Sequence, residues 1–94
     1  MVKMSEELLQ GPIEMFSNGD LDGALADLEG KIKDHAGVPE LHHMWAEFAN
    51  MKNTEAQDDV IAGRKIMKAY KTAMDLDEEN MEYIADFASF ALEC

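Results

Sequence analysis

Histidine and carboxylate side chains are the residues of this chain best suited to hold a transition metal. His42 and His43 are adjacent, and because a helix turns about 100° per residue, they cannot easily share one ion. His43 and Glu47 are four residues apart and can face the same ion from one helix, but two protein ligands are too few for a site. His35 stands near an expected helix end, where a capping role is favoured. We therefore expect no transition-metal site and no cofactor.

An acidic segment, residues 18–29, has the spacing of calcium ligands. Asp20 and Asp22 would supply oxygen ligands, Gly23 a sharp turn and Glu29 the bidentate ligand. This order resembles the calcium loop of EF-hand proteins, with Asn18 in place of the usual first aspartate. An EF-hand-like calcium-binding protein using the loop 18–29 is therefore the alternative function, although a second, paired loop is not evident.

Motifs of the common enzyme classes are missing from the sequence. It has no glycine-rich phosphate loop, no serine between glycines in a nucleophile motif and no Cys-x-x-Cys pair. Its many acidic pairs fall on expected surface helices, where most carboxylates are only solvated. We expect that the protein is not an enzyme.

The net charge of the protein limits the classes of molecule that it is expected to bind. Twenty acidic residues oppose eight basic ones, which gives a formal net charge of -12. An excess of negative charge repels the phosphates of nucleic acids and of anionic membrane surfaces, so we expect neither as a partner. It leaves cationic partners open.

One cysteine, Cys94, cannot form a disulfide within the chain, which favours a reducing compartment. No secretory signal and no apolar run long enough to cross a membrane are apparent. We therefore expect a cytoplasmic protein.

Five helical segments are predicted, with no strand signal between them. Each has apolar residues at helical spacing and is bounded by turn signals such as Asn18-Gly19 and Gly37 with Pro39. The expected ranges are about 5–17, 21–35 and 39–51 for the first three helices and 79–92 for the fifth. The fourth helix is expected to begin between residues 54 and 58 and to end at residue 76. Short connections between helices predict antiparallel neighbours in an all-α domain that spans residues 1–94.

The segments also repeat. Displacing the third helix onto the fifth places Trp45-Ala46 on Phe87-Ala88. The stretch 19–28 has the pattern of a hairpin turn with its second helix, and the stretch 69–80 has the pattern of the end of a second helix and the link to the next repeat. The chain thus resembles the tetratricopeptide repeat family, whose helix-turn-helix unit has about 34 residues. The resemblance covers two and a half repeats: 5–38, 39–80 with an eight-residue insertion, and 81–94. It implies helical hairpins stacked as a right-handed array.

The resemblance further implies a protein-protein interaction module, a scaffold or adaptor, whose concave face binds a peptide or helix. In the family, the first helix of each hairpin lines that face. The matching positions are Leu9, Ile13, Phe16, Glu40, His43, Glu47, Asn50, Glu82 and Ser89. They are acidic with an apolar end, so we expect a partner with basic and apolar residues.

Two further surfaces carry open alternatives. The last helix has apolar residues on more than one face, Phe87 and Phe90 among them, and either contacts a second copy in a homodimer or packs against the fourth helix. Arg64, Lys68 and Lys71 share one face of the fourth helix and form either an anion site or a solvated stripe.

Overall fold

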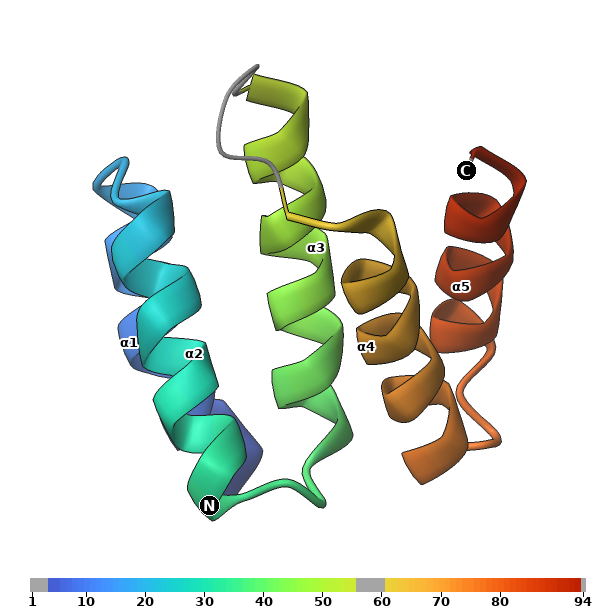
Figure 1. The fold of residues 1–94 in the computed structure, drawn as a ribbon. Coiled ribbons are helices and arrows are strands. Elements are labelled where there is room, and N and C mark those ends of the chain that lie inside the picture. The colour runs from blue at the N-terminus through green and yellow to red at the C-terminus, as the bar shows by residue number, and fades with distance from the viewer. Residues whose placement is uncertain (1–3, 56–60, 94) are drawn as a thin grey trace.

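The computed structural model describes residues 4–55 and 61–93. They form five helices, with no strand in these two ranges, which confirms the all-α prediction. Consecutive helices run antiparallel and lie beside one another, with α3 in the middle (Figure 1). The bounds are α1 Met4–Ser17, α2 Leu21–Asp34, α3 Pro39–Glu55, α4 Gly63–Leu76 and α5 Met81–Glu93. None of these helices is both long and apolar enough to cross a bilayer.

Side-chain caps fix two helix starts. The carboxylate of Asp20 accepts a hydrogen bond from the amide of Gly23 (2.9 Å), which begins α2. Gly19, just before it, has φ +84°, a left-handed conformation that ends α1 at little steric cost because glycine has no Cβ. Asn80 caps α5 in the same way as Asp20 caps α2.

The link from α3 to α4 differs from the prediction. Helix α3 continues to Glu55, one turn beyond the expected end, and α4 begins only at Gly63. Asn53 explains the extension: its side chain donates to the carbonyl of Ile61 and accepts from the amide of Ile61, each at 2.7 Å. The last turn of α3 thereby holds the chain as it enters α4. Part of the predicted insertion, residues 56–60, lies outside the described residues.

The core lies between α2, α3 and α4 and extends to α5. Three large side chains in it, Leu28, Leu41 and Ile66, are fully buried. Burying an aliphatic side chain of this size stabilises the fold by about 1.5–3 kcal/mol relative to leaving it exposed. The whole buried cluster consists of Ala24, Leu25, Leu28, Leu41, Ala46, Phe48, Ala49, Ile66, Tyr70 and Phe90.

The two large-small pairs of the predicted repeat, Trp45-Ala46 and Phe87-Ala88, have different environments. Trp45 and Phe87 are both partly buried and pack against the core. Ala46 is completely buried, whereas Ala88, its counterpart in the repeat, is exposed. The reason is that no described helix covers this side of α5.

Most of the large apolar side chains of the C-terminal helix are buried or partly buried against other helices of the chain. Phe90 is only 7% exposed and its ring lies 5.4 Å from that of Tyr70 on α4, so for this side chain the structure agrees with the second of the two alternatives, packing against the fourth helix. The large apolar residues that remain exposed on α5 are Met81 and Leu92.

Candidate functional site

One face of α3 carries His43 and, one turn later, Glu47. Residues four apart on a helix lie on the same face, and the two side chains are in contact: Nε2 of His43 lies 2.9 Å from Oε1 of Glu47. His43 is also the one buried polar or charged residue among those described, at 9% exposure. A buried imidazole needs polar partners, so its surroundings decide what the site can do.

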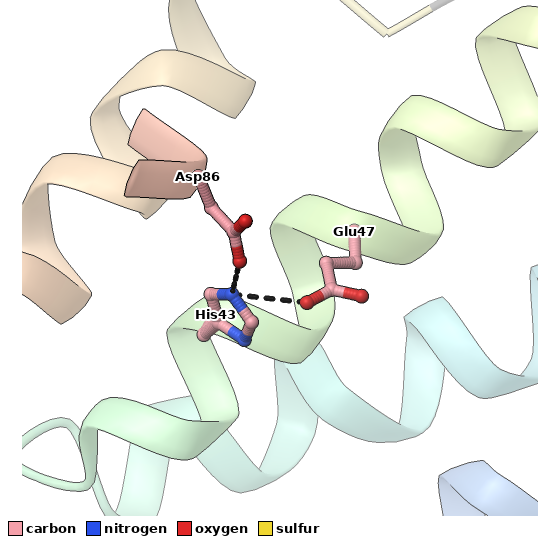
Figure 2. Close-up of side chains that lie close together, drawn as sticks. All are labelled: His43, Glu47 and Asp86. Carbon is pink, nitrogen blue, oxygen red and sulfur yellow. Dashed lines mark hydrogen bonds and ion pairs between the residues drawn. The ribbon is translucent and has the colours of Figure 1, made fainter. Parts of the chain in front are cut away.

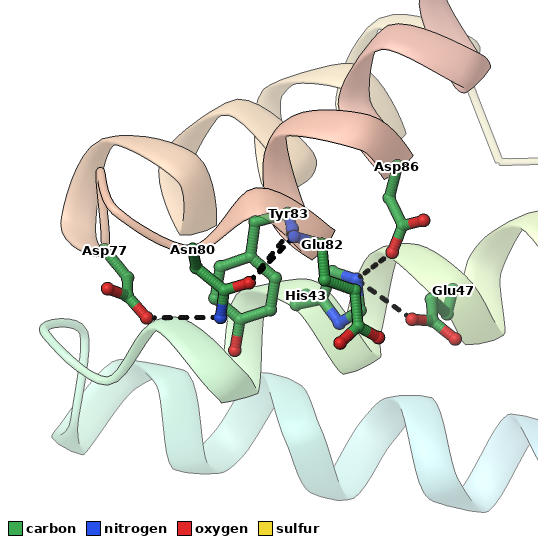
Figure 3. A network of polar contacts seen from close by, with 7 residues as sticks. All are labelled: His43, Glu47, Asp77, Asn80, Glu82, Tyr83 and Asp86. Atoms are coloured by element: carbon green, nitrogen blue, oxygen red, sulfur yellow. Dashed lines mark hydrogen bonds and ion pairs between the residues drawn. The ribbon is translucent and has the colours of Figure 1, made fainter.

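The start of α5 determines what faces His43. The Oδ1 atom of Asn80 accepts hydrogen bonds from the amides of Glu82 (3.0 Å) and Tyr83 (3.3 Å), and its Nδ2 donates to Asp77 at 3.2 Å (Figure 3). The cap sets where α5 begins. Tyr83 and Asp86, three residues apart, then lie on one face of this helix.

A carboxylate from α5 completes the cluster. Oδ2 of Asp86 lies 2.6 Å from Nε2 of His43, the same nitrogen that contacts Glu47 (Figure 2). The Tyr83 ring lies on the imidazole, with centroids 4.5 Å apart, and Tyr70 approaches it edge-on at 5.9 Å. The two tyrosines, from α4 and α5, thus pack against the ring that both carboxylates contact.

The cluster favours positive charge. Burial by itself would lower the pKa of His43, but the hydrogen bonds to Glu47 and Asp86, together with their negative charges, outweigh burial and raise its pKa above 6.5. The pKa of Tyr83 is raised to about 12 by burial and by the charges of nearby carboxylates, Glu40 first among them. The negative charges of neighbouring carboxylates contribute to both shifts.

Two adjoining hollows surround the cluster, and we call them together the acidic groove. One, of about 220 Å³, is lined from α1, α3 and α5, and the other, of about 370 Å³, from α3, α4 and α5. Glu47 and Glu82 line both. The lining includes four carboxylates and no lysine or arginine: Glu40, Glu47, Glu82 and Asp86.

Most residues expected on the concave face are brought together here. Those that line the acidic groove are Leu9, Glu40, His43, Glu47, Asn50 and Glu82. Ile13, Phe16 and Ser89 are exposed but outside this lining. Phe16 stacks on Phe48, which does line the groove, with ring centroids 4.8 Å apart.

Asp86 is the residue that sequence reasoning missed. It follows Glu82 by one helical turn, so it shares the face of a residue that was predicted to line the surface. That spacing was the available signal. With Asp86, the pair His43 and Glu47 becomes a set of three possible metal ligands whose donor atoms lie within 4.8 Å of one another, the one such set among the described residues. The sequence offered two candidate donors at this point, and the structure adds a third.

The calcium loop predicted for residues 18–29 is not a loop. Helix α2 begins at Leu21 and runs through Glu29, and the carboxylate of Asp20 caps its first turn. Asp22 instead forms an ion pair with Lys52 on α3 (2.8 Å). Helical backbone from Leu21 onwards cannot wrap the oxygens of Asn18, Asp20, Asp22 and Glu29 around one ion.

A second surface, here called the α2–α4 groove, shares no lining residue with the acidic groove. It consists of hollows of about 330 and 670 Å³ between α2, α3 and α4. Trp45 lines both, and its indole Nε1 is buried with no hydrogen-bond partner among the described residues. Basic residues from α4 line it, Arg64, Lys65 and Lys68, whereas Lys71 is exposed outside it.

Comparisons of the chain with known protein families, with curated proteins and with solved structures found no match. The resemblance to tetratricopeptide repeats stays a prediction from the sequence.

Proposed function

We propose that this protein is an interaction module whose acidic groove binds a cationic, partly apolar peptide or helix of a partner protein. The observation that carries the proposal is the composition of the groove, where Glu40, Glu47, Glu82 and Asp86 line the surface without any lysine or arginine beside them. Complementary charge guides association and selects the partner.

Apolar contact is available at one end. Ile13 and Phe16 on α1 are 45% and 40% exposed, and Phe16 stacks on a residue that lines the groove. An amphipathic helix places its anchors three and four residues apart, which matches a surface with an acidic stretch and an apolar end. The function that the sequence resemblance implies, peptide binding on a concave helical surface, agrees with this proposal.

No catalysis is proposed. The lining of the acidic groove offers no serine, threonine or cysteine that His43 could activate as a nucleophile. We infer a binding protein of a reducing compartment, the cytoplasm, since its single cysteine cannot cross-link the chain internally.

The test is selection of peptides from a displayed library on the wild-type protein, followed by affinity measurement of the selected peptides by fluorescence anisotropy. We expect them to carry net positive charge with apolar residues at helical spacing. Replacing Glu40 and Glu82 together by glutamine should weaken binding about fivefold or more, because two partly exposed charge pairs contribute about 0.5 kcal/mol each. Neither residue belongs to the His43 cluster.

Glu29→Gln is the matched control. Glu29 is an exposed carboxylate that lines the α2–α4 groove. The control should bind the selected peptides like the wild type. Peptides without positive charge, or equal binding by the Glu40/Glu82 double variant, would rule out the acidic groove as the binding surface. Light scattering on the free protein tests self-association, the other form of partner binding that the sequence raised.

A further inference from the structure

In the cluster of His43, Glu47 and Asp86, two carboxylate oxygens compete for one imidazole nitrogen. The Nε2 atom carries at most one hydrogen, yet it has a carboxylate oxygen at 2.6 Å (Asp86) and another at 2.9 Å (Glu47). A single hydrogen can serve both oxygens only as a shared, three-centre contact in which neither bond is well aligned. A metal ion in place of the hydrogen would contact the nitrogen and both oxygens at once.

We propose that His43 Nε2, Glu47 Oε1 and Asp86 Oδ2 bind one divalent first-row transition-metal ion of the Zn²⁺ type and so join α3 to α5. This goes beyond the proposed partner binding and does not depend on it. The three donors come from two helices and converge on one point (Figure 2).

The donor set indicates the class of ion. One imidazole nitrogen and two carboxylate oxygens suit zinc and its neighbours, whereas calcium requires six to eight oxygen ligands. With the imidazole neutral, the two carboxylates carry a charge that one divalent cation balances. Zinc bonds of about 2.0–2.1 Å separate tetrahedral ligands by roughly 3.3 Å. Each carboxylate oxygen therefore needs to move away from Nε2 by less than about 1 Å, and the two oxygens, which lie within 4.8 Å of each other, need to reach the same separation.

Exposure and ring packing support the site. The side chains of Glu47 and Asp86 are 39% and 38% exposed, so they can adjust and the ion can enter from solvent. Three protein ligands leave a fourth position for water, open to the acidic groove. Tyr83 and Tyr70 pack against the imidazole, so the ring loses less conformational entropy when it binds an ion.

The experiment uses the full chain with Cys94→Ser, because a thiolate would bind zinc by itself. Zn²⁺ is titrated calorimetrically, and Co²⁺ is used as a spectroscopic probe of coordination. We expect one ion per chain and a Co²⁺ spectrum of a four-coordinate site with nitrogen and oxygen ligands. Asp86→Asn and Glu47→Gln should each weaken Zn²⁺ binding by at least about tenfold. Ring ¹⁵N signals in NMR should change at His43 and not at His35 or His42.

Two controls separate this site from general attraction to an acidic protein. Glu82→Gln removes a carboxylate of the same groove that does not contact His43, and His42→Gln removes the neighbouring imidazole. Both should retain the wild-type affinity, and circular dichroism should show unchanged helix content in every variant. The proposal fails if the chain binds no stoichiometric zinc, or if Asp86→Asn and Glu47→Gln bind it as tightly as these controls do.

Discussion

The Nε2 atom of His43 lies 2.6 Å from Oδ2 of Asp86, although the two residues are 43 positions apart in the chain and belong to different helices. This contact fastens α5 to α3 across the acidic groove. It also makes the stability of the fold sensitive to the charge on one imidazole.

Stability should fall as pH rises through the pKa of folded His43. That pKa is raised above 6.5, so the folded state holds the proton more tightly than the unfolded state. The contribution of His43 is complete below pH 6.5 and is lost above its folded pKa. We expect the melting temperature, measured with a chelator present, to decrease between pH 6 and pH 8.5, and to decrease less in Asp86→Asn.

Glu82→Gln is the control for this pH effect, because any acidic protein gains stability when its net charge falls. It removes the same charge from the same groove without touching His43. Its melting temperature should follow the wild-type pH dependence. If Asp86→Asn and Glu82→Gln have the same pH profile, His43 is not the group responsible.

Ala46 and Ala88 should respond differently to one substitution. Ala46 is completely buried in the core, so Ala46→Leu should destabilise the protein by about 1–3 kcal/mol. Ala88→Leu, at the corresponding position of α5, should change stability by less than about 0.5 kcal/mol because Ala88 is exposed. Urea unfolding measures both. Equal losses would contradict the different environments of the two alanines.

Asn53 should stabilise the entry into α4. Asn53→Ala removes two hydrogen bonds to Ile61 and leaves the backbone groups of that residue without their partner. We expect a loss of about 1–3 kcal/mol in the free energy of unfolding. Asn18→Ala, at an exposed position, is the comparison and should cost less than about 0.5 kcal/mol. A similar effect of both substitutions would exclude a special role for Asn53.

Substitutions of Asp20 distinguish its role as a helix cap from the role of a calcium ligand. Asp20→Ala should destabilise the protein by about 1 kcal/mol because α2 loses its cap, whereas Asp20→Asn keeps an acceptor oxygen and should retain most of the stability. Both results should be the same with calcium and with chelator. A rise in the wild-type melting temperature on adding micromolar calcium, lost in Asp20→Asn, would restore the calcium interpretation.

Much of the local structure followed from the sequence. The helices were predictable because apolar residues at helical spacing and the turn residues between them act over a few positions. The contact of His43 with Glu47 was predictable for the same reason. The extension of α3 to Glu55 was missed, since it depends on Asn53 bonding to a residue beyond the turn.

The sequence by itself determined the helical class, the acidic charge and the residues of α3 that share a face, because all three depend on composition or on the helix period. Only the tertiary structure decided that Asp86 meets His43 and that residues 21–29 continue as helix α2. The contact between two helices depends on how side chains distant in the chain pack together, here those of α3, α4 and α5 around His43. Contacts between residues far apart in the chain leave no periodic pattern in the sequence from which they could be predicted.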